Sequence, residues 1–406
     1  MVDTTASGLR RPERIGLIGA QVGRSAGAGN FARSLRDALL QLPSGLDCRT
    51  ILVGEGGREE GAALVLTPDH PRGFRRAADY LNFDGADAVC IQHDFEGFAG
   101  AAGERLVELL PHLRAPVVTT FHEVPTHPEP EQQRILQRLA ESSSRTVVLS
   151  RKAAEILEDT YGIDRDLIDV IPCGVHGGSA LTAAAAKARL GLGGKRVLMT
   201  LGLLAPDKGI EVMIEALPAI VAAHPDVVYA VVGETHPSLV AREGESYRQS
   251  LLDLARQRGV DAHFMLIDEY PEGYDLCATL AAADLYVSPY LSEAELASHT
   301  LASAFALGKP VIATPFWYAR ELLGEGRGTL VAFGNPQALA GQVLELLGNP
   351  RKLASVSRRA QAAGREMLWP KVAQRYETLF ADAMRDGKGA PAYPRIARSI
   401  GSAVTG

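Results

Sequence analysis

The segment from Glu295 to Thr314 combines polar residues with the pattern of a short helix that precedes a strand. A polar loop leads into an apolar helix predicted over Leu301 to Leu307, and a Gly308-Lys309-Pro310 turn then leads into a buried strand. The first N–H groups of such a helix have no intrahelical partner and lie at the positive end of its dipole, which suits a phosphate. The segment follows a strand predicted from Leu285, and open α/β sheets bind ligands beyond the carboxyl ends of their strands. We therefore predict that the chain binds a diphosphate.

The composition is that of a globular protein with two or three domains: 406 residues, 46% hydrophobic and 22% charged. The formal net charge of −6 argues against nucleic acid as a partner, because nucleic-acid binders usually carry a basic excess. The four cysteines form no CxxC pair, so they indicate neither a zinc knuckle nor a disulfide framework. The N-terminus has no apolar signal core, and no apolar run reaches the roughly 18 residues of a membrane helix. We expect a cytoplasmic protein whose contact with membranes is at most peripheral.

Short apolar runs rich in β-branched residues alternate with helical patterns along the chain. Continuous apolar strands separated by helices are typical of parallel sheets covered on both faces. The sequence therefore predicts an α/β fold with two doubly wound parallel sheets. The expected strands are Arg14–Ile18, Cys48–Val53, Ala88–Ile91, Val117–Phe121, Arg145–Leu149 and Asp169–Ile171 in the first half, and Val197–Leu201, Val227–Val232, His263–Ile267, Leu285–Val287, Val311–Ala313 and Thr329–Ala332 in the second.

The helical pattern after Lys208 repeats apolar residues at i, i+3, i+4 and i+7, and Pro218 within it is expected to kink the helix or end it early. An Ala- and Gly-rich stretch over 177–194 predicts a hinge between two domains. We expect a first domain over 1–180, a second over 190–368, a C-terminal helix over 370–385 that packs back on the first domain, and a loose tail over 387–406.

Seven segments, taken in order, resemble motifs of the family-four retaining glycosyltransferases, and the resemblance covers roughly residues 14 to 385. That family has the GT-B fold, in which two Rossmann-like domains face each other across a cleft. No single segment is specific, but their order and spacing together are. The segments are Gly27–Phe31, which resembles the family's glycine-rich loop, the Gln-His-Asp segment Gln92–Phe98, Thr120-Phe121-His122, Ile171–Val175, Lys208-Gly209, Gly233, and Gly308–Ile312.

The resemblance implies transfer of a hexose from a nucleotide-diphosphate sugar to an acceptor hydroxyl, with the anomeric configuration kept. The second domain would bind the nucleotide sugar, and the first a carbohydrate or lipid-linked acceptor. Because negative charge develops on the departing phosphate, the protein should supply positive electrostatics and a dry cleft. In this family the leaving phosphate is thought to help deprotonate the acceptor, and neither a metal nor a further cofactor is required.

The resemblance assigns the phosphate contact to Lys208, at the start of a helix after a strand. A lysine there is mildly unfavourable beside the positive end of the helix dipole, so the alternative is an exposed residue without a role. The family's arginine, five residues earlier, is replaced by Leu203. The contact is therefore expected to depend more on backbone amides, or on an arginine from elsewhere.

The family's acidic motif is a pair of glutamates separated by seven residues. Glu295 occupies the first position, which in the family binds hydroxyls of the donor sugar, although the nearby Glu293 is an alternative. The second position, which holds the nucleotide ribose, is Ser303, and a hydroxyl makes a weaker, neutral contact. The backbone amides expected to bind the phosphate are those of Ser298, His299, Thr300 and Leu301. The His299 ring either reaches the diphosphate or caps the helix.

His122 ends a buried strand, and the resemblance places it beside the donor sugar, the alternative being a histidine satisfied within the fold. His93 and Asp94, after the preceding strand, are expected on the acceptor side. Gly27 and Gly29 would let the backbone approach the donor, with a plain turn or a dinucleotide site as alternatives.

Three further marks complete the expected site. Gly233 matches the glycine that ends the family's second strand in the C-terminal domain. Glu321 is expected near the nucleotide, and Trp317 and Tyr318 either line the site or pack in the core. The spacing of His93, His122 and His127 matches no zinc pattern.

Two other functions remain open. A phosphorylase of related fold would use free phosphate, and the weakened ribose contact at Ser303 favours it. A non-catalytic nucleotide-sugar binder is favoured by Leu203 and Ser303 together, but the retention of Lys208, His122 and Glu295 argues against it.

Overall fold

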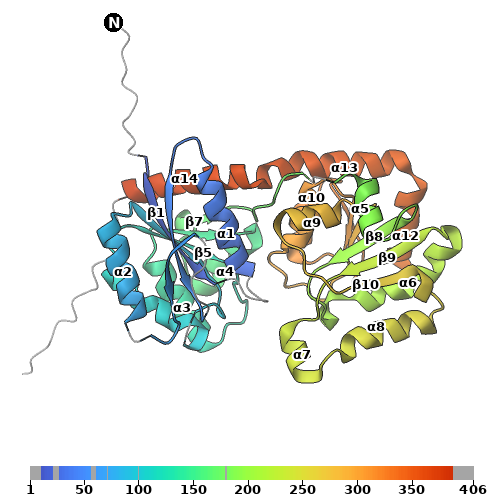
Figure 1. Ribbon diagram of the computed structural model, residues 1–406, viewed down its shortest axis with the longest axis horizontal. Coiled ribbons are helices and arrows are strands. Elements are labelled where there is room, and N and C mark those ends of the chain that lie inside the picture. The colour runs from blue at the N-terminus through green and yellow to red at the C-terminus, as the bar shows by residue number, and fades with distance from the viewer. Residues whose placement is uncertain are drawn as a thin grey trace, which may run out of the picture.

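Two lobes lie side by side in the computed structural model, each built on one parallel sheet with helices packed against it (Figure 1). The structure describes residues 11–21, 27–55, 61–70, 72–98, 100–178 and 181–386. The predicted pair of doubly wound parallel sheets is confirmed. The tail expected over 387–406 lies outside the described residues.

The first sheet has seven strands, all paired in parallel. In chain order its elements are β1 (Arg14–Ala20), α1 (Gly27–Leu40), β2 (Asp47–Val53), β3 (Ala62–Leu66), α2 (Gly73–Asp84), β4 (Ala88–His93), η1 (Ala101–Glu108), η2 (Leu110–His112), β5 (Val117–Phe121), α3 (Pro130–Glu141), β6 (Arg145–Val148), α4 (Arg151–Tyr161), η3 (Arg165–Leu167) and β7 (Ile168–Val170). The strand order is β3-β2-β1-β4-β5-β6-β7. β3 is absent from the predicted strands because it is an edge strand in which only Leu66 is fully buried.

The glycine-rich segment expected as a loop is the start of a helix instead. Gly27 and Gly29 lie in the first turn of α1, so the prediction of a loop at these positions is wrong. Phe31, Ala32 and Leu35 continue this helix with the apolar spacing of a buried face. That periodicity, rather than the two glycines, decides the local structure.

The second sheet has six strands in the order β10-β9-β8-β11-β12-β13. In chain order its elements are α5 (Ala183–Arg189), β8 (Arg196–Leu201), η4 (Pro206–Lys208), α6 (Ile210–Ala223), β9 (Val227–Val232), α7 (Pro237–Glu243), α8 (Ser246–Gln257), η5 (Asp261–His263), β10 (Phe264–Ile267), α9 (Gly273–Leu280), β11 (Leu285–Ser288), α10 (His299–Ala306), β12 (Val311–Ala313), α11 (Trp317–Leu323), β13 (Thr329–Leu330), α12 (Pro336–Gly348), α13 (Pro350–Gly364) and η6 (Arg365–Met367).

Helix α6 continues through its proline, so the expected early end at Pro218 is wrong. A proline inside a helix costs about 3 kcal/mol. Met213, Ile214, Leu217 and Ile220 are all fully buried, and each such side chain contributes about 1.5–3 kcal/mol. The buried face of α6 therefore outweighs the cost of the proline.

The last helix, α14 (Trp369–Arg385), crosses from the second lobe back to the first, along the top of Figure 1. It packs against α1, and the Tyr376 hydroxyl lies 2.9 Å from the Thr120 hydroxyl in the core of the first lobe. Pro370 lies in its first turn, where the missing N–H costs little. No described helix is both long and apolar enough to cross a membrane.

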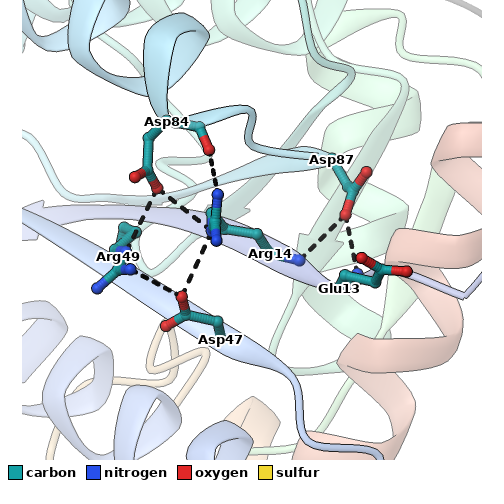
Figure 2. Close-up of polar contacts among 6 residues, drawn as sticks. All are labelled: Glu13, Arg14, Asp47, Arg49, Asp84 and Asp87. Carbon is teal, nitrogen blue, oxygen red and sulfur yellow. Dashed lines mark hydrogen bonds and ion pairs between the residues drawn. The ribbon is translucent and has the colours of Figure 1, made fainter.

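A network of charged side chains joins the amino ends of β1 and β2 (Figure 2). Arg14 and Arg49 share the carboxylates of Asp47 and Asp84, with N–O distances of 3.0–3.4 Å. The Asp87 carboxylate accepts hydrogen bonds from the amide of Glu13, just before β1, and from the amide of Arg14, the first residue of the strand. Because these groups are partly exposed, each pair contributes about 0–1 kcal/mol. The network lies at the edge of the sheet opposite the carboxyl ends.

Gly174 tests the packing between the linker and α14. A Cβ built on Gly174 would overlap atoms of the Trp369 ring. Gly174→Ala should therefore destabilise the protein by about 1–3 kcal/mol, because a rigid indole cannot move aside cheaply. Urea denaturation of Gly174→Ala and of the control Gly193→Ala, whose new Cβ would meet no atom within 4 Å, measures the difference. Equal midpoints for the two variants would contradict the packing.

Candidate active site

A cavity of about 800 Å³ lies between the carboxyl ends of the two sheets. Parallel α/β sheets bind ligands at this edge. The first lobe lines it with residues after β1, β2, β4 and β5 and from the start of α1, and the second lobe with the loop after β10 and the start of α10. Lining residues used below are Asn30, Asp94, Glu96, His122, Glu123, Tyr270, Glu272, Tyr274, His299, Thr300 and Trp369.

His122 lies at the first-lobe wall of the cavity, directly after β5. Its Nε2 is 2.9 Å from Gln92 Oε1, and the Gln92 amide group donates to Thr120, so the histidine Nε2 carries the proton. The ring packs edge-on against Phe31, with centroids 4.9 Å apart. Burial lowers the pKa of His122 to about 4. At neutral pH this side chain is therefore an uncharged hydrogen-bonding group rather than a cation.

His93 does not line the cavity, although its neighbour Asp94 does. The His93 ring is fully buried among Phe95, Phe98 and Phe121, and neither ring nitrogen has a hydrogen-bond partner among the described residues. Burial, and then the proximity of His122, lower its pKa to about 3. Successive side chains of a strand point to opposite faces, which explains why only one of the two residues expected beside the acceptor reaches the cavity.

Lys208 ends the short helix η4, and its ammonium group is held from three sides. Nζ lies 3.0 Å from Glu295 Oε1, 2.9 Å from Asp207 Oδ2 and 4.4 Å from the centre of the Tyr290 ring. Burial alone would lower the pKa of Lys208, but Tyr290, Glu295 and Asp207 together raise it above its usual value. The side chain is therefore a fixed cation. Tyr290 is a residue that the sequence reasoning missed, because no motif marks it.

Two close backbone contacts bring the Lys208 and Glu295 loops together. Gly209 has a φ of 64°, and a Cβ at this position would overlap the carbonyl of Pro289. The amide of Leu291 donates to the Asp207 carbonyl over 2.8 Å. The connection after β8 is therefore packed directly on the connection after β11, and only glycine fits at the crossing.

Gly233 ends β9 and has a comparable packing role. A Cβ here would overlap the carbonyl of Gly202, so the end of β9 lies tightly against the end of β8. Gly233 does not line the cavity. Its carbonyl accepts a hydrogen bond from Arg248, whose guanidinium also pairs with Asp268 at 2.8 Å. Arg248 supplies a cation near the ends of β9 and β10, and no sequence motif marks it.

Helix α10 begins two residues earlier than predicted, and Ser298 is its cap. The Ser298 hydroxyl accepts the amide of Leu301 over 3.4 Å, so this amide is already occupied. The amides of His299 and Thr300 have no partner among the described residues. The His299 ring is exposed to the cavity, where it interacts with the Gly174 backbone, and enclosure lowers its pKa. His299 is thus a neutral cavity residue and not the helix cap.

Two residues expected at the nucleotide are inaccessible. Ser303 is 1% exposed and Leu301 is fully buried, both within α10. A ligand would contact the Ser303 hydroxyl only if the helix moved. Every residue from Leu301 to Ala306 is buried, so this part of α10 has no side that faces a ligand.

Glu321, expected near the nucleotide, joins the two lobes instead. Its carboxylate accepts a hydrogen bond of 2.9 Å from the backbone amide of Arg151, in the first turn of α4. The same carboxylate forms an ion pair with the Arg151 side chain. Nearby, Lys152 lies over the Trp317 ring at 5.7 Å, and Tyr318 is buried. None of the three residues Trp317, Tyr318 and Glu321 lines the cavity. Among the described residues, no three His, Cys, Asp or Glu side chains are grouped as metal ligands would be.

Two sequence profiles match the chain. The profile for glycosyltransferase family 4 matches residues 27–177, and the one for glycosyl transferases group 1 matches residues 184–363. A D-inositol 3-phosphate glycosyltransferase from Segniliparus rotundus is 29% identical over 273 residues, which cover 65% of this chain but only 58% of that protein. A GDP-mannose-dependent alpha-(1-6)-phosphatidylinositol monomannoside mannosyltransferase from Mycolicibacterium smegmatis is 28% identical over 281 residues, covering 65% of this chain and 70% of that protein.

Solved structures share the fold at lower identity. Anabaena HepE in complex with UDP and glucose has a TM-score of 0.71 at 19% identity, covering 91% of this chain and all of that one. A glycosyltransferase from Rickettsia africae has a TM-score of 0.73 at 18% identity, covering 92% and 99%. These likenesses and the two parallel sheets establish the GT-B fold.

The pair between Lys208 and Glu295 can be measured by a double-mutant cycle. Both side chains are about one quarter exposed, so we expect a coupling energy of about 1 kcal/mol, above the value for a fully exposed pair. Urea unfolding of Lys208→Met, Glu295→Gln and the double variant gives this energy. A coupling of zero would show that the two groups are not in contact in solution.

Proposed function

Because the chain belongs to glycosyltransferase family 4, we propose that it transfers a hexose from a nucleotide-diphosphate sugar to an acceptor hydroxyl with retention of configuration. One observation carries this proposal: the Lys208 ammonium and the unpartnered amides of His299 and Thr300 belong to adjoining loops at the carboxyl edge of the second sheet. The donor diphosphate binds at this edge. The acceptor binds on the side of the cavity formed by the first lobe.

The positive end of α10 and the ammonium of Lys208 stabilise the leaving group. In the reaction the bond from the anomeric carbon to the diphosphate oxygen breaks, and a bond from the same carbon to the acceptor oxygen forms on the same face. Negative charge then grows on the diphosphate, where the two amides and the cation meet it without reorganisation. Glu295, 3.0 Å from Lys208, holds the cation in place and supplies an acceptor for hydroxyls of the donor sugar.

The acceptor proton goes to the departing diphosphate oxygen. His122 is a weak base at neutral pH, because burial lowers its pKa to about 4. It acts as an uncharged hydrogen-bond partner of the sugar, with Nε2–H held by Gln92. The mechanism therefore needs no separate protein base, no metal and no cofactor other than the donor.

The donor base and the acceptor are not transferred from the relatives. Similar solved structures contain UDP or UDP-glucose, and one relative is a GDP-mannose-dependent enzyme. The S. rotundus protein is named for D-inositol 3-phosphate, but the match spans 58% of it. We propose a nucleotide sugar as donor, a carbohydrate or lipid-linked acceptor, no nucleic acid, and a cytoplasmic location.

Replacement of the proposed phosphate ligand tests the assignment. With the best donor from a panel of UDP- and GDP-sugars, Lys208→Ala should lower kcat/KM by about 10²–10³, the usual loss when one group that stabilises a developing anion is removed. The control Lys371→Ala, at an exposed position on α14, should retain full activity. Unchanged turnover in Lys208→Ala would remove this lysine from the mechanism. Turnover that requires inorganic phosphate and no nucleotide would favour a phosphorylase instead.

Retention is tested separately by the anomeric configuration of the product. With an α-linked nucleotide sugar, we expect an α-glycoside, recognised by the small H1–H2 coupling in the proton NMR spectrum recorded during the reaction. A β-glycoside would exclude the retaining mechanism while leaving the transferase activity intact.

A further inference from the structure

We propose that the acceptor side of the cavity selects an acceptor without negative charge, one that presents hydroxyl or ammonium groups rather than phosphate or carboxylate. This inference rests on the proposed function, because it takes the first-lobe wall as the place where the acceptor binds. Three carboxylates at the ends of β4 and β5 carry it. They are Asp94, Glu96 and Glu123, called the acidic wall below.

The acidic wall lies beside the reacting centre. The register of the first sheet pairs His93 with Phe121, so the next residues along each strand, Asp94 and His122, lie side by side. Glu123 follows His122 directly, and Glu96 is two residues after Asp94. All of these except His93 and Phe121 line the cavity.

Carboxylates outnumber cations in the described part of the lining. Asp37, Glu55 and Glu272 join the acidic wall to make six acidic side chains, against one arginine, Arg33, and no lysine. Of the three histidines of the described lining, His122 is uncharged at neutral pH because burial lowers its pKa to about 4, and desolvation also lowers the pKa of His176 and of the more exposed His299.

Among the described acidic side chains of the lining, Asp37 is paired with Arg36 at 2.7 Å, whereas Glu272 accepts a hydrogen bond from the neutral amide of Asn30 across the cavity. None of the ion pairs among the described residues includes Asp94, Glu96 or Glu123. Burial, with smaller contributions from Asp94 and Glu96, raises the pKa of Glu123 to about 7, so this side chain is ionised only in part at neutral pH. Burial also raises the pKa of Asp94.

Asp94 is fixed in position before any ligand binds. It is 8% exposed, and its Oδ1 accepts the amide of Gly97, so the carboxylate cannot swing out to solvent. Carboxylate oxygens accept hydrogen bonds and cannot donate them. The groups that such a wall binds are therefore hydroxyl or ammonium donors. A phosphate would meet like charge within the roughly 8 Å over which physiological salt leaves charges unscreened, although Glu96 and Glu123 themselves are exposed.

Acceptors that differ only in charge test the inference. With the donor identified from the panel, kcat/KM for transfer to glucose, glucosamine and glucose 6-phosphate is measured, and inhibition of donor hydrolysis by each sugar is measured alongside. In the wild-type protein, kcat/KM for glucose and glucosamine should be at least tenfold higher than for glucose 6-phosphate, or these two sugars should inhibit donor hydrolysis at least tenfold more strongly. A preference for glucose 6-phosphate, or an absence of any effect of all three sugars, would overturn the inference.

The double variant Glu96→Gln/Glu123→Gln links the selectivity to the acidic wall. This variant should use glucose 6-phosphate as an acceptor, or be inhibited by it, at least tenfold more strongly than the wild-type protein, and its response to glucosamine should be weaker. The control Glu158→Gln/Asp159→Asn neutralises two carboxylates on the exposed face of α4 and should leave the responses to glucose 6-phosphate and to glucosamine unchanged. Equal responses of the two double variants would show that only net charge matters, and the assignment to the wall would fail. If the wild-type protein neither transferred nor hydrolysed any donor of the panel, the proposed function itself would be rejected.

Discussion

The crossing of two backbone segments at Gly209 determines where the Lys208 ammonium lies, although neither Lys208 nor Glu295 is among the residues that line the cavity. The connection after β8 is packed against the Pro289 carbonyl, and a second contact from Leu291 to Asp207 closes the same crossing. These contacts bring Lys208, Glu295 and the start of α10 to one edge of the sheet, although 87 residues separate the two charged groups. Without the crossing, the ammonium of a long, flexible side chain would sample solvent, and the amides of α10 would act alone on an anion.

The cavity exists because both lobes are held at a distance by structures outside it. Helix α14 crosses between the lobes and buries Tyr376 against Thr120, while the linker at Val175 pairs with the chain around Leu368. Glu321 on α11 accepts the first amide of α4, so the positive end of a first-lobe helix meets a carboxylate of the second lobe. These contacts lie beside the cavity rather than in it. Some cavity-lining groups also join the two sides: Asn30 donates to Glu272, and the rings of Phe31 and Trp369 lie 5.0 Å apart.

The strands were predictable because buried parallel strands are continuous apolar runs, whereas the site was predictable only in part. Lys208 and Glu295 follow strands whose carboxyl ends share one edge, so their proximity follows from topology. Sequence motifs do not report burial, which is why Ser303 was expected to face a ligand and is instead enclosed within α10. Tyr290 under the ammonium has no motif, because its role depends on the three-dimensional crossing alone.

The charges of the cleft are divided between its two walls, and this division limits how the leaving group can be stabilised. The first-lobe wall supplies five of the six described carboxylates of the lining together with Arg33, and its His122 is uncharged at pH 7 because burial lowers the pKa of this histidine to about 4. In the proposed reaction, with Leu203 in the position of an arginine, the stabilisation of a departing diphosphate falls to Lys208, to the amides of His299 and Thr300, and to the dipole of α10. An anionic donor would be attracted to the Lys208 ammonium and the start of α10, and it would be repelled by the acidic wall. A donor placed by this field would present its sugar toward the acidic wall, where hydroxyl groups find acceptors and a second anion does not.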